Sequence, residues 1–176
     1  GWAGAESVKA ADLDAAALAR VAIDKAARSR KPRRLAPGRY TVILEPAAVG
    51  ELLTFLLYSM DARNADEGRS FFSRPGGGNR VGEDLLGERI TLRSDPSDSL
   101  TPAQPFSREG VPHRPVTWID RGKVASLAYG RYWAQQKGKA PLPAPSCAHL
   151  LGGEAEGAAA LLKGVKRGVL ITRFWY

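Results

Sequence analysis

The segment of residues 46–60 constrains the fold most, because its apolar side chains cover most of a helical circumference. Pro46 suits the first turn of a helix, where a missing N–H group costs nothing. Apolar residues then dominate from Ala47 to Met60. A helix that is apolar on nearly every side is expected in the core of a protein. The chain must therefore supply other elements that pack around a helix predicted over residues 46–62.

Short segments with β-branched residues or helical periodicity, separated by glycine and proline, supply those elements. Strands are predicted over residues 39–44, 89–93 and 169–176, and a hairpin over residues 116–119 and 123–127. Helices are predicted over residues 13–28 behind the candidate N-cap Asp12, over 129–137 ending at Gly138, and over 161–166. Residues 94–105 and 141–146 are rich in proline and are predicted to lack regular structure. Together, these predicted strands and helices indicate an α+β fold with a mixed or mostly antiparallel sheet packed on helices.

The predicted elements divide the chain into two parts. Residues 1–36 are interpreted as a helix plus a basic linker from a preceding region, and residues 37–176 as the first part of a folded domain. The sequence stops inside a hydrophobic strand and opens without an initiator methionine. We therefore expect an internal fragment of a longer protein, incomplete at both ends, whose last strand has an open edge.

Composition excludes several classes of protein. The chain has 176 residues, a formal net charge of +8 and a single cysteine, Cys147. One cysteine cannot form a disulfide within the chain and is typical of a reducing compartment. No apolar run approaches the roughly 20 residues of a membrane-spanning helix, and no signal peptide opens the sequence. These features predict a soluble, cytoplasmic protein without a membrane partner.

The main cluster of charge is the basic stretch from Lys25 to Arg34. It could contact a nucleic acid or an acidic partner. It could also be a solvated helix end followed by a linker, because cations favour the carboxyl terminus of a helix. No aromatic residue or nucleic-acid motif accompanies it, so the solvated helix end is the favoured interpretation and a nucleic-acid partner is not expected.

Residues that could carry chemistry are few. Gly76-Gly77-Gly78-Asn79 lacks the Lys-Ser/Thr pair of a phosphate-binding loop and the third glycine of a dinucleotide fingerprint. Cys147 and His149 could contact one metal ion, but two ligands do not make a zinc site. His113 is interpreted as an exposed loop residue. None of these residues predicts a cofactor site.

Carboxylates are the remaining candidates for acid–base or metal chemistry. Asp66, Glu67 and Glu109 satisfy no spacing rule, and most such carboxylates are simply solvated. Glu51 differs, because it lies in the apolar helix that is expected to be buried. A buried carboxylate needs a partner or a function.

Six motifs in order resemble the TldD/PmbA family of metallopeptidases. They are residues 44–53 (Leu-Glu-Pro-Ala-Ala-Val-Gly-Glu-Leu-Leu), 67–72 (Glu-Gly-Arg-Ser-Phe-Phe), 81–83 (Val-Gly-Glu), 108–112 (Arg-Glu-Gly-Val-Pro), 118–124 (Trp-Ile-Asp-Arg-Gly-Lys-Val) and 167–174 (Arg-Gly-Val-Leu-Ile-Thr-Arg-Phe). The resemblance runs from about residue 37 to residue 176. It implies a part of the family's C-terminal domain.

The resemblance also implies where a zinc site would lie. In the family's catalytic subunit a helix carries His-Glu-x-x-x-His, and a distant cysteine completes the zinc site. Pro46, Ala47 and Glu51 stand at the positions of the first histidine, the glutamate and the second histidine. The cysteine is expected beyond Tyr176, so Cys147 does not take its role. No catalytic or metal-binding residue is therefore expected in this chain, and its enzymatic status stays open.

The leading hypothesis is the non-catalytic, PmbA- or TldE-like subunit of the family. The resemblance implies pairing with a zinc-bearing TldD-like subunit, or a self-dimer, and the trimming of peptides in a shared chamber. Zinc is expected in the partner and no cofactor in this chain. Possible chamber or substrate contacts are Glu51, Glu67, Arg69, Ser70 and Phe71. The alternatives are a hydrolase with a non-zinc site around Glu51 and Glu67, and a basic nucleic-acid-binding module.

Overall fold

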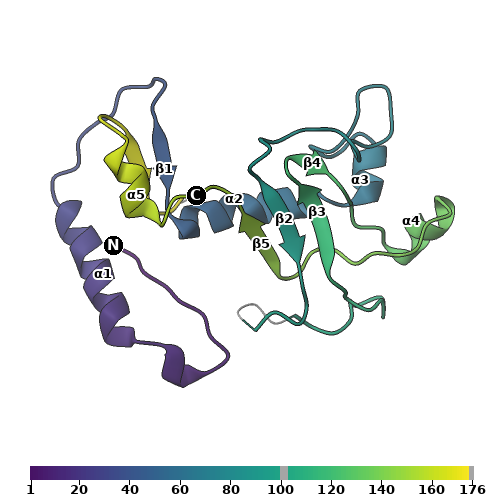
Figure 1. The fold of residues 1–176 in the computed structure, drawn as a ribbon, viewed down its shortest axis with the longest axis horizontal. Helices are drawn as coiled ribbons and strands as arrows, with labels where there is room; N and C mark the ends of the chain where they lie inside the picture. Colours follow the sequence, from purple (N-terminus) through teal and green to yellow (C-terminus); the bar gives the residue numbers. More distant parts are fainter. Residues whose placement is uncertain (100–102, 175–176) are drawn as a thin grey trace. The chain divides into compact units, whose positions relative to one another are not determined.

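The computed structural model describes residues 1–99 and 103–174 and divides the chain into two units, residues 1–39 and 40–176 (Figure 1). The first unit holds a short 3₁₀ helix η1 (Ala10–Asp12) and the helix α1 (Ala15–Arg28). The N-cap of α1 is Asp14, whose carboxylate accepts a hydrogen bond from Ala17 N at 2.8 Å. The predicted C-terminus at Arg28 is confirmed. The predicted N-cap is wrong by two residues, because Asp12 closes η1 instead.

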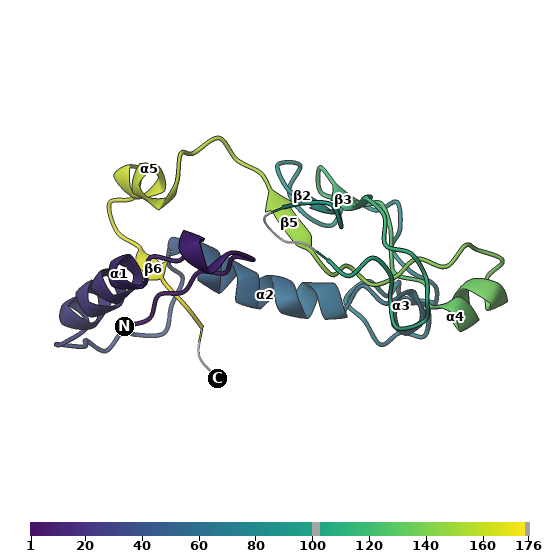
Figure 2. The same cartoon turned by 90° about the horizontal axis from the view of Figure 1, so that it is seen from below.

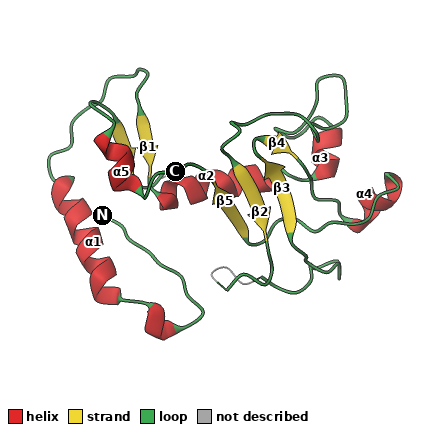
Figure 3. Ribbon diagram, in the orientation of Figure 1, coloured by secondary structure: helices red, strands yellow, loops and turns green. Residues whose placement is uncertain are grey.

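The larger sheet of the second unit has four antiparallel strands in the order β4-β3-β2-β5 (Figures 1 and 3). The strands are β2 (Thr91–Ser94), β3 (Val116–Asp120), β4 (Lys123–Val124) and β5 (Ala148–Leu151). Arg121 and Gly122, with φ of 45° and 84°, form the tight turn between β3 and β4. The predicted hairpin is confirmed, although its second strand ends at Val124 rather than at residue 127.

A separate pair of parallel strands joins the two ends of the second unit. Strand β1 (Val42–Leu44) pairs with β6 (Val169–Ile171), and Val42 lies opposite Val169. The helix α5 (Ala158–Lys163) precedes β6 and begins three residues earlier than predicted. Strand β6 ends at Ile171, so the predicted strand over residues 169–176 is too long, and its last two residues lie outside the described part of the chain.

The helix α2 (Pro46–Tyr58) follows β1 directly and begins at Pro46 as predicted (Figure 2). Its predicted burial is wrong, because Ala48 is the only buried residue that it contributes among the described residues. Leu53, Leu56 and Leu57 pack against the core. Leu52, Phe55 and Tyr58 remain 48%, 52% and 79% exposed. The helix therefore presents one apolar face to the core and a second apolar face outward.

The core lies between the larger sheet, residues 60–72 that follow α2, and residues 127–142. Its largest fully buried side chains are Trp118, Phe72, Met60, Leu92, Ile119, Leu127 and Val124. The indole Nε1 of Trp118 donates a hydrogen bond to Ser94 Oγ at 2.8 Å, which satisfies the polar atom of the largest buried ring. The observed α+β architecture, with an antiparallel sheet and a second parallel pair, confirms the predicted fold class.

Three short elements complete the second unit. The helix α3 (Ala62–Asp66) is capped by Asp61, whose side chain accepts from Asn64 N at 2.7 Å. The helix α4 (Arg131–Gln136) is shorter than predicted, and Gly138 beyond it has the positive φ of a helix C-terminus, 63°. Neither α3 nor β5 was predicted. Among the described helices, none combines the length and apolarity needed to cross a bilayer.

Candidate functional site

The outward face of α2 lines a hollow of about 500 Å³, which we call the α2 pocket. Its lining residues are Glu51, Leu52, Thr54, Phe55, Tyr58, Arg173 and Phe174. Five come from α2 and two from the segment that follows β6. Apolar and aromatic side chains with a few polar groups are typical of sites that bind small molecules or peptide side chains.

Glu51 links the two parts of the chain that line the α2 pocket, helix α2 and the segment after β6. Its carboxylate accepts hydrogen bonds from Arg173 Nε at 2.9 Å and from the backbone N–H of Phe174 at 2.6 Å. The Glu51 side chain is 31% exposed, so the expectation of a fully buried carboxylate is wrong. The expectation that it needs a partner is met by an arginine 122 residues further along the chain. Both carboxylate oxygens are engaged in holding the segment after β6.

The donors at the start of α2 do not fit a zinc ion. Pro46 occupies the first turn and has no ligand atom in its side chain, and Ala47 has only a methyl group. Glu51 would supply one carboxylate, whose oxygens already accept two hydrogen bonds. Among the described residues, no group of three His, Cys, Asp or Glu side chains is placed to hold a metal ion. Zinc normally needs at least three protein ligands, so this donor set supports no metal-dependent step.

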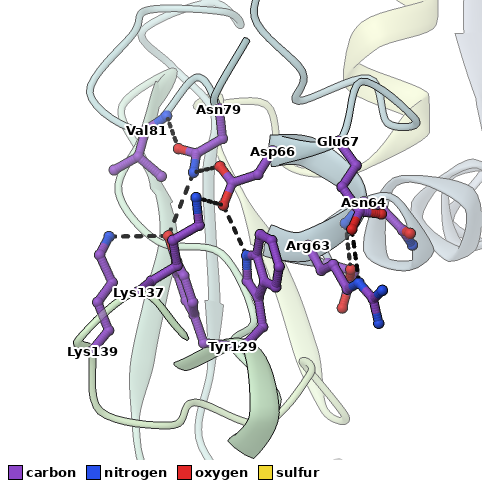
Figure 4. Close-up of polar contacts among 11 residues, drawn as sticks. Arg63, Asn64, Asp66, Glu67, Asn79, Val81, Tyr129, Lys137 and Lys139 are labelled. Atoms are coloured by element: carbon purple, nitrogen blue, oxygen red, sulfur yellow. Dashed lines mark hydrogen bonds and ion pairs between the residues drawn. The ribbon is translucent and has the colours of Figure 1, made fainter. Parts of the chain in front are cut away.

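A second polar centre surrounds Asp66 at the end of α3 (Figure 4). The Asp66 side chain is 9% exposed, and its Oδ1 accepts from Asn79 Nδ2 at 2.7 Å. Its Oδ2 accepts from Trp133 Nε1 at 2.8 Å and lies 3.5 Å from Lys137 Nζ. Lys139 Nζ donates to Tyr129 Oη at 3.0 Å beside it. The partners of Asp66 come from the glycine loop and from α4, so this carboxylate ties distant segments together.

The predicted contacts Glu67, Arg69, Ser70 and Phe71 lie in the segment after α3 and not in the α2 pocket. Glu67 forms ion pairs with Arg63 and Arg69. The hydrogen bond from Arg63, with the one from Arg69 acting in the same direction, holds the pKa of Glu67 below its ordinary value. Glu67 lines a different, open hollow with Gly76 and Gly77. Glu51 and Glu67 thus belong to separate hollows.

Ser70 and Phe71 differ in their surroundings. The Ser70 hydroxyl donates to the carbonyl of Ser59 at 2.5 Å and accepts from Phe72 N at 3.1 Å, so it holds the local chain. Phe71 is exposed and meets the buried Phe72 edge-to-face, with 5.2 Å between ring centroids. Of the five predicted contacts, the structure brings Glu51 alone into the α2 pocket.

The other candidate residues lie outside the α2 pocket. Glu109 accepts a hydrogen bond from Arg131 N at 2.9 Å and so caps the start of α4. Cys147 is buried and donates to the carbonyl of Asp95 at 3.3 Å, and His149 Nε2 lies 3.3 Å from an Asp98 carboxylate oxygen. His113 is half-buried in a loop.

The apolar members of the α2 pocket were missed because a helix that is apolar on nearly every side was expected to be buried as a whole, with Leu52 and Phe55 in the core. Tyr58 was not singled out from the sequence. Arg173 was missed because its motif gives no indication of a partner in α2. The sequence did offer one signal for this pocket: large apolar residues on a helix face that is not required for packing against the core.

The chain matches the family model described as the PmbA/TldA metallopeptidase C-terminal domain over residues 37–176. This match covers most of the chain, and the chain therefore belongs to that family. Among curated proteins, no significant match is found.

Solved structures agree with this assignment of the fold. A protein from Bacteroides thetaiotaomicron, described as a candidate modulator of DNA gyrase, is 22% identical with a TM-score of 0.83, and the alignment covers 97% of this chain and 38% of that one. A protein from Thermotoga maritima with the same description is 21% identical with a TM-score of 0.85, and the alignment covers 95% of this chain and 40% of that one. TldE from Thermococcus kodakarensis is 20% identical with a TM-score of 0.74, covering 94% and 39%. The chain thus spans about two fifths of the length of the solved structures that it matches.

Proposed function

We propose that this chain is part of a non-catalytic, TldE-like subunit that pairs with a zinc-bearing TldD-like subunit in a peptide-trimming metallopeptidase. The resemblance in sequence carries the proposal: it implies that Pro46, Ala47 and Glu51 stand where a zinc helix of this family has His, Glu and His. The similarity in fold to TldE supports it. The expected location of the complex is the cytoplasm.

The chemistry of these three residues supports a partner that supplies the catalysis. A metallopeptidase needs ligands that hold zinc and a base that accepts a proton from the attacking water. Proline and alanine side chains can do neither. Glu51 is engaged with Arg173 and Phe174, so it stabilises the walls of the α2 pocket instead.

The α2 pocket is the surface that we assign to the peptide. Leu52, Phe55 and Tyr58 offer exposed apolar and aromatic area on one helix face. Exposed apolar area that is rimmed by polar groups is typical of binding sites for peptides and proteins. In this proposal the pocket forms part of the chamber wall and orients the peptide for cleavage at the zinc of the partner.

Reconstitution tests the proposal directly. The full-length parent protein is purified alone and together with a His-Glu-x-x-x-His relative from the same source. Copurification, bound zinc and cleavage of an unstructured peptide are then measured. We expect zinc in the relative and full activity in the pair only. Stoichiometric zinc and peptidase activity in the parent protein alone would contradict the proposal.

A pair of tyrosine variants tests the role of the pocket within the same complex. Tyr58→Ala removes an exposed ring from the α2 pocket, and we expect a higher KM for peptides with little change in kcat. Tyr132→Ala is the matched control, because Tyr132 is an exposed tyrosine on α4 outside the pocket. Equal effects of the two variants would remove the pocket from the peptide-binding surface.

The alternative hydrolase is tested in the parent protein with Glu51→Gln and Glu67→Gln. The two carboxylates line separate hollows, which gives no support to a shared acid–base site. Activity that is present without a partner and lost in both variants would favour the alternative.

A further inference from the structure

The segment of residues 25–39 concentrates almost all of the net charge of the chain. It holds seven lysines and arginines and no aspartate or glutamate, whereas the whole chain carries +8. The cations are Lys25, Arg28, Arg30, Lys31, Arg33, Arg34 and Arg39. The proposed peptidase function gives this segment no role.

The structure leaves five of these cations available, and we call them the basic strip: Arg30, Lys31, Arg33, Arg34 and Arg39. All five are exposed. Arg28 is paired with Asp24 at 2.9 Å, but within the described part of the chain no ion pair involves a residue of the basic strip. Apart from the bend near residue 38, residues 32–39 have no regular structure, and Pro32 and Pro37 prevent α1 from continuing into them. The strip is therefore a group of exposed cations without ion pairs in the irregular segment that follows α1.

We propose that the basic strip binds the phosphate backbone of a double-stranded nucleic acid without sequence preference. Four of its five cations are arginines, whose planar guanidinium groups match phosphate oxygens in a bidentate manner. Residues 25–39 contain no aromatic side chain. This absence made a nucleic-acid partner unexpected from the sequence, but it argues against a single strand only and leaves the backbone of a duplex open. Single-stranded nucleic acids are bound largely by stacking of bases on aromatic rings, so the composition favours the backbone of a duplex.

The number of cations sets the expected dependence on salt. Each neutralised phosphate of duplex DNA contributes a slope of about −0.9 to the plot of log K against log salt concentration. Five contacts give a slope of about −4.5, so the affinity falls roughly 500-fold between 50 and 200 mM salt. The variant Arg30→Gln/Lys31→Gln/Arg33→Gln/Arg34→Gln leaves one cation of the strip and should reduce the slope to about −0.9.

A control variant separates the strip from general attraction by the net charge. Four cations outside the strip are exposed and form no ion pair within the described residues: Arg108, Arg114, Lys166 and Arg167. Replacing all four by Gln removes three arginines and one lysine, the same number of each as the strip variant removes. Both variants therefore carry the same net charge and differ only in the position of the lost cations.

The experiment measures fluorescence anisotropy of two 20-bp DNA duplexes of unrelated sequence and one RNA duplex, with the whole chain, at 50 to 200 mM salt. We expect similar affinity for both DNA sequences, loss of binding in the strip variant and retention in the control. A preference for DNA or RNA identifies the source of the phosphates. Circular dichroism checks that both variants remain folded.

Three results would overturn the proposal. One is the absence of binding at 50 mM salt. Another is an equal loss of affinity in the strip variant and in the control, which would indicate attraction by net charge alone. The third is competition by polyglutamate as effective as that by duplex at equal charge concentration, which would point to an acidic protein as the ligand.

Discussion

Replacing Asp66 by asparagine should destabilise the second unit more than any other exchange of a carboxylate for an amide among its described residues. The Asp66 carboxylate is nearly buried and receives N–H groups from Asn79 and Trp133, with Lys137 beside it. An asparagine side chain keeps one acceptor oxygen and introduces an NH₂ group. In either orientation, that NH₂ group faces one of the two N–H donors.

The surroundings do not allow a simple rearrangement. Asn79 cannot turn its amide to compensate, because its Oδ1 already accepts from Val81 N at 3.1 Å. The indole of Trp133 has a donor only. The variant therefore loses one hydrogen bond to a charged acceptor, about 1.5–3 kcal/mol, and leaves a partly buried donor unsatisfied. We expect a loss of about 3 kcal/mol in the free energy of unfolding, or roughly 10 °C in Tm for a chain of this length.

Urea denaturation monitored by tryptophan fluorescence measures this loss. Glu67→Gln is the control, because Glu67 is the next residue but forms exposed ion pairs with Arg63 and Arg69. Such pairs contribute little to stability, so the midpoint of the control should stay close to that of the unmodified chain. If Asp66→Asn lowered the midpoint no more than Glu67→Gln, the Asp66 contacts would not stabilise the fold and our reasoning would be refuted.

Two further predictions concern a turn and an ion pair. Gly122→Ala places a Cβ atom 2.3 Å from the carbonyl oxygen of Leu86 at a φ of +84°, whereas Gly138→Ala meets no atom within 4 Å at a φ of +63°. Thermal unfolding should show that the free energy of unfolding falls by about 1 kcal/mol for Gly138→Ala and by several times more for Gly122→Ala. Equal losses in the two variants would contradict the steric argument. Arg63→Gln should raise the pKa of Glu67 toward its ordinary value of 4.5 in an NMR titration. Because the folded-state pKa is lowered, the ion pair contributes stability above the unfolded-state pKa and loses it as the pH falls through the folded-state pKa, so an unchanged pKa in the variant would show that Arg63 is not its cause.

Local patterns predicted the elements whose stabilising contacts lie close in sequence. The hairpin at residues 116–124 was predicted because Asp-Arg-Gly between two apolar runs specifies a tight turn. Helix α1 ends at Arg28, as its periodicity indicated. Strand β5 was missed because Ala148–Leu151 does not alternate, and its ladder partner β2 lies more than fifty residues earlier. Pairing over such a distance leaves no local signal.

The polar centres could not be predicted for a similar reason. The partners of Asp66 lie 13 and 67 residues away, and those of Glu51 lie 122 and 123 residues away. Sequence alone singled out Glu51 because it was expected to be buried; that expectation is wrong, although the carboxylate does accept two hydrogen bonds. The sequence could not identify Arg173 as the partner, because nothing in the short strand β6 indicates which helix the residues after it will contact.

Helix α2 shows that an apolar circumference does not by itself place a helix in the core. On one face of α2, the core is already covered by apolar side chains, those of Leu53, Leu56 and Leu57. The remaining apolar residues, Phe55 and Tyr58 among them, lie on the face that lines the α2 pocket. Large apolar side chains that the core does not need are retained at a cost in solvation unless they contact a ligand or partner. The mistaken expectation of burial and the proposed contact with peptides therefore have the same physical origin, an excess of apolar residues over what the core can cover.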